Sequence, residues 1–576
     1  MKSEPTRARS LRRQLTATFY RKNKATFFVT AGAMLLLGGA LLAVAWILQQ
    51  IIDIASGNSV APLVRMCWLC LGVLVSVTTI YVVQCYTYPA FLRRAMKQYK
   101  EYAFTELTKK SISTFSDENT SRYISALTND AVSIETNYLA KIFTLLTKCI
   151  TFVGGLVMML LYSPLLTGFA LLLSLVPLAV SVLCGNRLAR METEVSRQNE
   201  SFVAMTKDLL SGFSVVKSFK AEAEVVARFC RRNEELEETK GRRRRMEEVI
   251  TMLGTGAGIV AQLGVFLFGA YLAVTKQGVT PGVVIVFLPL MSFVVDPIGS
   301  VPPILANRRA AVALIDKLAD AVGKNVRESG EQMDPVLRDG ITIDHLTYGY
   351  HESAPVLNDV SVRFEAGKSY AIVGTSGSGK STLVNLLMGS SNDYQGSIRF
   401  DQRELRSIAA ESLYGLVSVV QQNVFIFDDT IRNNITMFRH FDEKLVQQAT
   451  EKAGLTPLLA ERGEDYICGE NGSGLSGGER QRISIARCLL RQTPVLLIDE
   501  ATAALDAATA YSVSAAILAI EGLTRIVVTH RLEEPLLRKY DEILVLKNGE
   551  ICERGSFDAL MARREQFYSL FNVANG

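Results

Sequence analysis

Charged residues are scarce in this sequence. Asp, Glu, Lys and Arg make up 21% of its 576 residues, hydrophobic residues make up 49%, and the mean hydropathy is +0.20. This composition excludes a disordered chain, which combines low hydrophobicity with high net charge. Most of the apolar excess lies in residues 1–306, which argues against an ordinary soluble enzyme.

Cysteine and positive charge are also informative by their placement. The nine cysteines are scattered without framework spacing, which excludes a disulfide scaffold. Residues 1–24 carry eight Lys or Arg and the single acid Glu4, so the rest of the chain sums to about −2 of the total +5. A basic segment beside apolar stretches indicates the cytoplasmic surface of a membrane and not a nucleic-acid partner.

The apolar excess resolves into six stretches, each long enough to cross a hydrocarbon core of about 30 Å. The first has no charge over 22 residues, is too long for the apolar region of a signal peptide and has no convincing cleavage site, so we interpret it as a membrane anchor. The expected spans are 27–48, 66–88, 142–162, 164–185, 249–274 and 279–305.

The segments between the spans predict the orientation. Residues 51–61, Ser163 and 275–279 contain one lysine, whereas 89–141 and 186–248 are rich in Lys and Arg. The positive-inside rule therefore places both termini and the two long segments in the cytoplasm, with the chain in the cell (plasma or inner) membrane. Neither 90–140 nor 186–248 contains proline, so we expect helices that continue beyond the membrane, with breaks near 113–119 and 211–214.

The remaining chain divides into a polar linker and a soluble domain. We expect a basic cytosolic segment at 1–24, a transmembrane domain at 25–306, a linker at 307–339 with a turn at Asp334-Pro335, and a domain with α/β patterning at 340–576.

A phosphate-binding loop is predicted at the start of this domain. The apolar strand at 370–373 is followed by Gly374-Thr375-Ser376-Gly377-Ser378-Gly379-Lys380-Ser381 and then by a helical run from Thr382. Glycines let backbone N–H groups surround phosphate oxygens at a helix N-terminus. Lys380 would reach the β- and γ-phosphates of ATP, and the Ser381 hydroxyl would bind Mg²⁺. The alternative, a glycine-rich turn that binds nothing, fits the strand–loop–helix context poorly.

A second strand ends in two acids. Residues 494–498 are apolar and lead to Asp499 and Glu500, which is typical of a buried parallel strand that presents carboxylates at its carboxyl end. Asp499 would support Mg²⁺ through water, and Glu500 would polarise the attacking water. This pattern is weak alone and strong beside the phosphate loop.

Between these motifs lies Leu475-Ser476-Gly477-Gly478-Glu479, which leads into a helical run. Here the sequence closely resembles the ABC transporter family, whose signature reads LSGGQ, with Glu479 in the last place. The resemblance implies that Tyr350 stacks on adenine and that Gln422 contacts Mg²⁺ and senses the γ-phosphate. It also implies a cross-talk loop at 469–472 and a loop after the catalytic acid that contains Ala504 and Asp506; the family commonly has Ser in place of Ala504. His530, one of only four histidines in the chain, would be the switch histidine.

The resemblance covers nearly the whole chain and implies a half-transporter of the exporter fold: an all-α six-helix transmembrane domain with long cytosolic extensions, followed by an α/β P-loop ATPase domain. Coupling helices would lie near Phe115 and Phe213. No peptidase domain or substrate-binding domain is expected.

In the family, ATP is closed between the phosphate loop of one domain and the Ser476-Gly477-Gly478 segment of another, so two chains are needed. Intact Glu500, His530 and signature glycines slightly favour a homodimer, and a heterodimer stays open.

Polar residues inside the spans are candidates for cargo contact. Asp296, in the proline-rich sixth span, is the clearest: it would meet cargo in an inward cavity, pair with a Lys or Arg of a neighbouring helix, or lie at the wet end of the cavity. Weaker candidates are Gln49, Gln50, Gln84 and Gln262. Cys67 and Cys70, one helical turn apart, favour ordinary packing over a metal or redox site.

The sequence thus predicts an ATP-hydrolysing, Mg²⁺-dependent membrane transporter that works as a dimer among membrane lipids. It would move a small molecule, peptide or lipid by alternating access, with export favoured. Two alternatives stay open: an exporter-fold importer of a metal-siderophore, and an ATP-gated channel or regulatory subunit. The sequence does not identify the cargo.

Overall fold

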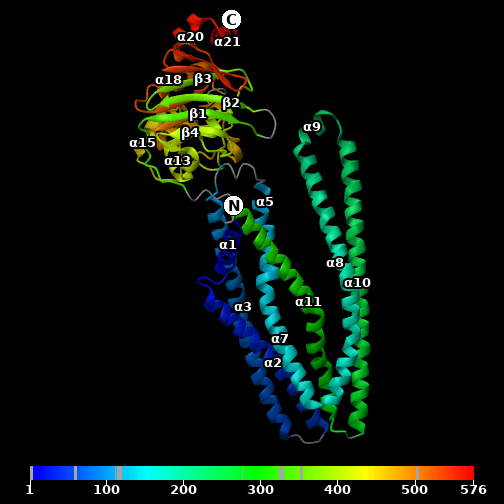
Figure 1. Ribbon diagram of the computed structural model, residues 1–576. Coiled ribbons are helices and arrows are strands. Elements are labelled where there is room, and N and C mark those ends of the chain that lie inside the picture. The colour runs from blue at the N-terminus through cyan, green and yellow to red at the C-terminus, as the bar shows by residue number, and fades with distance from the viewer. Residues whose placement is uncertain are drawn as a thin grey trace. The chain divides into compact units, whose positions relative to one another are not determined.

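The computed structural model describes residues 4–56, 61–110, 112, 120–275, 277–323, 330–350, 355–500 and 505–575. The described chain forms two compact units, one of 1–107 with 121–324 and one of 108–120 with 325–576 (Figure 1). The first unit is helical, and the second contains all the described strands. The predicted fold class, a helical membrane domain followed by an α/β ATPase domain, is confirmed.

Helices of the first unit are long because the apolar segments and the polar segments that follow them both favour helix. The helices are α1 (Glu4–Thr18), α2 (Lys24–Ser56), α3 (Ala61–Leu107), α5 (Thr120–Leu127), α6 (Asn129–Ile134), the π-helical turn η1 (Glu135–Leu139), α7 (Ala140–Tyr162), α8 (Pro164–Ser211), α9 (Phe213–Ser218), α10 (Glu222–Val274) and α11 (Pro281–Gly323).

Five helical segments among the described residues are long and apolar enough to cross a membrane: Lys24–Ser56, Pro62–Leu107, Arg122–Tyr162, Glu222–Val274 and Pro281–Gly323. The fourth expected span, 164–185, lies within α8, whose described apolar part is Pro164–Val176. Ser163 caps this helix, and its side chain accepts a hydrogen bond from the Leu166 N–H, so the predicted turn before Pro164 is present.

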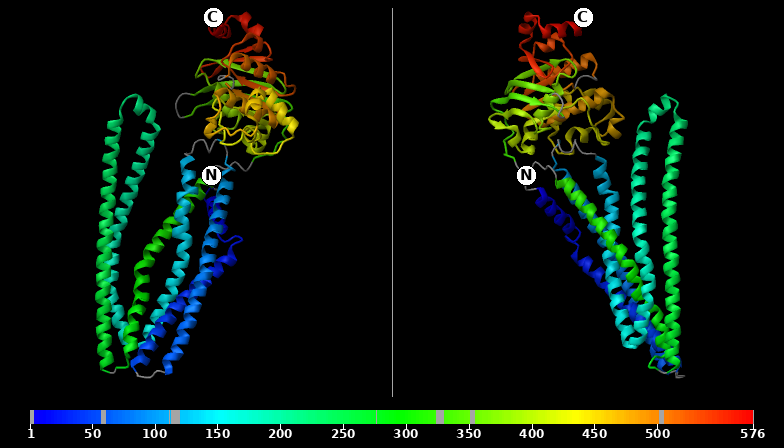
Figure 2. Two further views of the ribbon diagram at one scale, coloured as in Figure 1. Left: turned by 180° about the vertical axis from the view of Figure 1, so that it is seen from behind. Right: turned by 45° about the vertical axis from the view of Figure 1, so that its right-hand side comes forward.

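The expected helical extensions are present, and one of the two breaks is described. Helix α8 ends at Ser211, and the short helix α9 separates it from α10, where the break near 211–214 was predicted (Figures 1 and 2). Helices α8 and α10 pack along each other, with the Phe169 and Phe268 rings 4.6 Å apart and an Arg243–Glu192 ion pair of 2.8 Å. The other predicted break, at 113–119, lies outside the described residues.

The linker expected at 307–339 is different in the structure. Helix α11 continues to Gly323, because Ala311, Ile315 and Leu318 are buried against other helices in a cluster that a polar linker would not form. Residues 330–339 belong to the second unit, where the Glu331 N–H donates to the Ser407 carbonyl and Leu337 is buried. Helix α11 also runs through all four prolines of the sixth span, Pro289, Pro297, Pro302 and Pro303.

The basic N-terminal segment is more than a charged tail. Helix α1 buries Leu11 and Leu15, and Phe19, which follows it, stacks on Tyr99 of α3 with ring centroids 5.2 Å apart. Arg12 pairs with Asp316 of α11 at 3.1 Å. The segment therefore combines basic residues with an apolar stripe that packs on the helical unit.

A carboxylate joins the ends of α2 and α11. Asp53 of α2 accepts hydrogen bonds from the Gly282 N–H (2.9 Å) and the Thr280 hydroxyl (2.8 Å), and thereby satisfies a free donor at the N-terminus of α11. A Cβ on Gly282 would lie 2.5 Å from both the Asp53 carboxylate and the Gln49 carbonyl, so only glycine permits this approach.

Gly282→Ala is therefore expected to lower the free energy of unfolding by about 1–3 kcal/mol, the usual cost of overpacking. Gly299→Ala is the matched control, because Gly299 lies in the same helix with no atom within 4 Å of an added Cβ. Thermal melting of both purified variants checks this prediction. Equal melting temperatures for the two variants would contradict it.

The second unit contains two sheets. One has the order β2-β1-β4-β5 and is antiparallel; the other has the order β10-β9-β3-β8-β7-β6, with β9, β3, β8, β7 and β6 parallel. The strands are β1 (Gly340–Tyr348), β2 (Leu357–Glu365), β3 (Ser369–Gly374), β4 (Gln395–Phe400), β5 (Arg403–Glu404), β6 (Val417–Val420), β7 (Val495–Asp499), β8 (Thr524–Val528), β9 (Glu542–Lys547) and β10 (Glu550–Gly555).

Helices cover the parallel sheet, so its central strands β3 and β8 are buried along their whole length. The helices and short helical turns described in this unit are α12 (Lys380–Leu387), η2 (Leu405–Ser407), α13 (Ala410–Leu416), α14 (Ile431–Thr436), α15 (Glu443–Lys452), α16 (Thr456–Arg462), η3 (Glu470–Gly472), α17 (Gly477–Arg491), α18 (Ala507–Leu518), α19 (Glu534–Leu537), α20 (Phe557–Arg563) and α21 (Gln566–Asn575). The carboxyl ends of β3, β8, β7 and β6 meet at one edge, where ligands of such sheets usually bind.

Candidate nucleotide site

The predicted phosphate loop lies between β3 and α12. Gly374 and Gly379 adopt φ values of 155° and 99°, respectively. A Cβ on Gly374 would lie 2.2 Å from the Leu546 carbonyl oxygen, and a Cβ on Gly379 would lie 2.9 Å from the Val356 carbonyl oxygen. These positions therefore require glycine on grounds of conformation and space. The side chains of Thr375 and Ser376, like Gly377, are exposed at the tip of the loop.

The loop holds a cation and an unused hydroxyl. The Lys380 ammonium donates to the Gly374 carbonyl (3.0 Å) and the Thr375 carbonyl (2.9 Å). Burial lowers the pKa of Lys380, and the nearby Glu500 and Asp499 oppose this shift. Among the described residues, the buried Ser378 hydroxyl has no hydrogen-bond partner. A buried cation, a free hydroxyl and a helix N-terminus fit a phosphate group.

Two acids face this loop from β7. The Ser381 hydroxyl donates to Asp499 Oδ1 at 3.0 Å. Burial raises the pKa of Asp499, and the hydrogen bond from Ser381 opposes this effect. The hydroxyl and carboxylate oxygens of this pair are hard ligands of the kind that Mg²⁺ prefers, so the donor set fits this ion.

The Glu500 carboxylate contacts side chains that follow two other strands of the sheet. Gln422 Nε2, after β6, donates to Glu500 Oε2 at 3.0 Å, and His530 Nε2, after β8, lies 2.7 Å from Glu500 Oε1. The backbone of Glu500 has a φ of 53°, which is unusual for a residue other than glycine, and its N–H donates to the Val528 carbonyl. Three residues far apart in the sequence thus meet at one carboxylate.

Tyr350 and Thr382 lie close together beside α12. The Tyr350 hydroxyl is 3.2 Å from Thr382 Oγ1, and its ring meets Tyr348 edge to face at 5.3 Å. The Tyr350 side chain is 57% exposed, so one ring face is available for a flat partner.

The signature segment begins helix α17. The Ser476 hydroxyl accepts from the Glu479 N–H (3.3 Å), and Glu479 Oε2 accepts from the Ser476 N–H (2.7 Å), which is a capping box. The departure from LSGGQ therefore has a local structural role, since Glu and Gln both serve at this position. Gly477 and Gly478 form the first turn of the helix.

Asp506 caps α18 through the Thr509 N–H at 2.9 Å, and this backbone hydrogen bond lowers the pKa of Asp506. Residues 501–504, including Ala504, lie outside the described chain. Of the expected cross-talk residues 469–472, Gly469 precedes the turn η3 and the other three form it, with a φ of 51° at Asn471.

Sequence reasoning missed two arginines that support the site. Arg487 of α17 donates to the carbonyls of Asn434 and Phe425, and so joins the signature helix to the segment after Gln422. Arg531 donates to the Leu505 carbonyl at 2.6 Å and joins the His530 segment to the segment of Asp506. The only sequence feature that could have drawn attention to Arg531 was the neighbouring His530. Arg487 lies inside an amphipathic helix, where an arginine by itself does not indicate a functional role.

The polar residues of the spans belong to the helical unit. Asp296 pairs with Lys148 of α7, with Nζ and Oδ2 2.5 Å apart. Gln49 donates to Asp53, Gln50 to Gln49, Gln84 to Met34 Sδ, and Gln262 to Ser292. Cys67 and Cys70 are free thiols, and no metal-binding group of three or more His, Cys, Asp or Glu occurs among the described residues.

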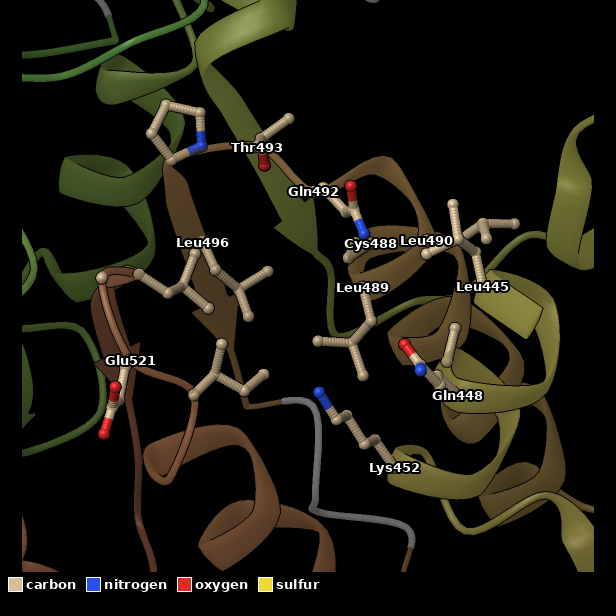
Figure 3. Close-up of a pocket in the computed structure, with 15 residues that line it drawn as sticks. Leu445, Gln448, Lys452, Cys488, Leu489, Leu490, Gln492, Thr493, Leu496 and Glu521 are labelled. Carbon is tan, nitrogen blue, oxygen red and sulfur yellow. The ribbon is translucent and has the colours of Figure 1, made fainter. Parts of the chain in front are cut away.

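A cavity of about 280 Å³ lies at the opposite edge of the parallel sheet, near the amino-terminal ends of β7 and β8. Figure 3 shows Lys452 projecting into it from α15, whereas the Glu521 carboxylate points away. The strands separate this cavity from Glu500 and the phosphate loop, which lie at their carboxyl ends. Its lining combines apolar side chains with Gln448, Lys452 and Gln492, and none of the described residues that line it belongs to a glycine-rich loop of the kind that surrounds a phosphate.

A membrane-spanning helical unit joined to a phosphate-loop ATPase defines the class of this protein. The family model for the transmembrane region of ABC transporters matches residues 27–298, and the ABC transporter model matches residues 357–503. Together they account for the greater part of the chain, which belongs to the ABC transporters as a half-transporter with a fused transport ATPase domain.

Relatives and a solved structure agree with this assignment. The chain is 28% identical over 569 residues to an ATP-dependent lipid A-core flippase of Syntrophus aciditrophicus, covering 95% of this chain and 92% of that one. It is 28% identical to an uncharacterised ABC transporter ATP-binding protein of Bacillus subtilis, covering 81% and 78%. A bacterial Atm1-family ABC exporter with ATP bound has the same fold, with a TM-score of 0.84 and 23% identity over 95% of this chain and 99% of that one.

Proposed function

We propose that this chain is a subunit of an ATP-driven exporter that works as a homodimer. The observation that carries the proposal is the convergence of Lys380, Asp499, Glu500, Gln422 and His530 at one edge of the sheet, in a chain with one phosphate loop and one signature segment. The fold of the ATP-bound exporter and the flippase names of the relatives support export.

The residues around the phosphate loop divide the work of ATP hydrolysis. The backbone of Gly374–Gly379 and the Lys380 ammonium bind the phosphates of ATP, and Tyr350 stacks on adenine. Ser381, Gln422 and Asp499, the last through water, would hold Mg²⁺, which supplies charge neutralisation at the β- and γ-phosphates when bound. Lys380 exchanges its bonds to the loop carbonyls for bonds to phosphate oxygens.

Glu500 accepts the proton of the attacking water. Its carboxylate is oriented by Gln422 on one oxygen and by His530 on the other, so its position is fixed before substrate binds. His530 donates to Glu500 or to the γ-phosphate, and so links the carboxylate to the reacting group.

The signature residues complete the site of a second chain. Ser476, Gly477 and Gly478 present a hydroxyl and free amides at the N-terminus of the 15-residue helix α17, which favours the γ-phosphate bound to the opposite subunit. Asp506 caps the start of α18 and so positions the chain segment that would lie between the two ATP sites of the dimer. A membrane arrangement with both termini in the cytoplasm places the ATPase unit where ATP is available.

The chain expressed alone is expected to purify as a dimer near twice 63.3 kDa and to hydrolyse ATP. Light scattering after size exclusion, combined with an ATPase assay in uncharged detergent, checks both properties. A monomer without activity that gains activity on adding a second half-transporter would establish a heterodimer instead.

Direction is tested in vesicles that expose the ATPase unit to the bath. Export from the cell corresponds to ATP-dependent movement of cargo into the lumen, whereas the siderophore-import alternative requires movement out of it. A channel would let cargo equilibrate without accumulation. Asp296 is a candidate contact for cargo in this proposal, because its carboxylate stays exposed although it pairs with Lys148.

A further inference from the structure

Only two charged residues occur within the six apolar segments. Residues 27–48, 66–88, 142–162, 164–185, 249–274 and 279–305 contain Lys148 and Asp296 and no other Asp, Glu, Lys or Arg. These two residues are 148 positions apart in the sequence and form one ion pair between α7 and α11. The charged chemistry of the spans is therefore concentrated at one place, where the net charge is zero.

The two partners are unequally exposed. The Lys148 side chain is 19% exposed, whereas that of Asp296 is 65% exposed. Asp296 uses Oδ2 to accept from Lys148, so its carboxylate is both neutralised on one side and open on the other. An acidic group with this geometry can accept a second cationic partner without leaving Lys148.

Asp296 lies on a polar strip of α11. Ser292, one turn earlier, is exposed and its hydroxyl is 3.4 Å from Gln262 Nε2 of α10, while Met291, Val294 and Pro297 face the helical core. A strip with a carboxylate, a hydroxyl and an amide is costly against hydrocarbon, so it is suited to a hydrated cavity or to a polar ligand.

We infer that the Lys148–Asp296 pair is a binding site for the headgroup of a zwitterionic amphiphile, which extends the proposed transport function by naming a class of cargo. The ammonium of the headgroup binds the open side of the Asp296 carboxylate, and its anionic group lies beside Lys148. Four charges then alternate in sign and sum to zero, which is the least costly arrangement in a region of low dielectric constant.

Net-charged ligands fit this pair less well. An anionic headgroup meets a lysine that Asp296 already neutralises and is repelled by the exposed carboxylate. A cationic headgroup is attracted by Asp296 but leaves an uncompensated positive charge beside Lys148. The pair therefore selects by charge balance, through repulsion of the wrong partners as well as attraction of the right one.

Three single-chain amphiphiles that share the same alkyl chain test this inference. Hexadecylphosphocholine, hexadecyl sulfate and hexadecyltrimethylammonium share the hexadecyl chain and carry a zwitterionic, an anionic and a cationic headgroup, respectively. Their affinity for the full-length protein in uncharged maltoside detergent is measured by thermophoresis without nucleotide. We expect the zwitterion to bind about tenfold more tightly than either charged probe, a difference of about 1.4 kcal/mol.

Variants assign the selectivity to the pair. Asp296→Asn is expected to move the preference to hexadecyl sulfate, and Lys148→Gln to hexadecyltrimethylammonium. The double exchange Lys148→Asp with Asp296→Lys restores a neutral pair and is expected to restore the preference for the zwitterion. Lys141→Gln, two turns away on α7, is the matched control and should leave the order of affinities unchanged.

Tighter binding of either charged probe by the unmodified protein would overturn the inference, and this measurement does not depend on any variant folding. An unchanged order in both single variants with unaltered melting temperature would also overturn it. Because binding is measured without ATP, its failure is distinguishable from failure of the proposed function, which would appear as absence of ATP hydrolysis or of transport.

Discussion

Replacing Glu500 by Gln is expected to lower the steady-state ATPase rate by about 10²-fold or more while ATP still binds, because a general base contributes about 10²–10⁴-fold. The amide has nearly the same shape as the carboxylate but does not accept the proton of the attacking water. The phosphate loop, with Lys380 and the loop glycines, is unchanged, so the nucleotide should remain bound and two ATPase units should stay closed around it.

The measurement is phosphate release together with binding of a fluorescent ATP analogue. Glu521→Gln is the matched control, since Glu521 is an acid at the opposite edge of the same sheet, pointing away from the cavity there (Figure 3). A rate near that of the unmodified protein would show that Glu500 is not the catalytic base. Loss of binding as well as turnover would indicate that the carboxylate supports the fold of the loop.

Replacing Lys380 by Ala is expected to weaken nucleotide binding by about 10- to 100-fold, corresponding to the 1.5–3 kcal/mol of a hydrogen bond to a charged group. Lys380 is the cation whose ammonium already lies in the loop, 3.0 Å from the Gly374 carbonyl and 2.9 Å from the Thr375 carbonyl. The substitution removes this cation but leaves the backbone amides, so binding should weaken without being abolished.

Titration with the fluorescent ATP analogue measures the loss, and ADP and AMP provide a comparison. The effect should be large for ATP and small for AMP, because Lys380 reaches the β- and γ-phosphates and not the α-phosphate. Lys444→Ala, an exposed lysine at the start of α15, is the control. Equal affinity of the Lys380 variant for ATP would count against the phosphate-loop assignment.

The sequence by itself determined the local features. The strand–loop–helix order around Lys380 is set by residues that are neighbours in the chain, and the apolar lengths of the spans are set by the thickness of the membrane. The capping of α17 by Ser476 and Glu479 is equally local, as is the break between α8 and α10. These features follow from backbone conformation and periodicity, which a single sequence records.

Only the tertiary structure decided what depends on packing. It brought Gln422 and His530 to Glu500 because three strands that are far apart in sequence are adjacent in the sheet. It joined Lys148 to Asp296, and it extended α11 to Gly323, because helix rotation and the burial of Ile315 depend on neighbouring helices. A single sequence does not show how a helix is rotated about its own axis, and this rotation decides which partner a charged side chain in a span contacts.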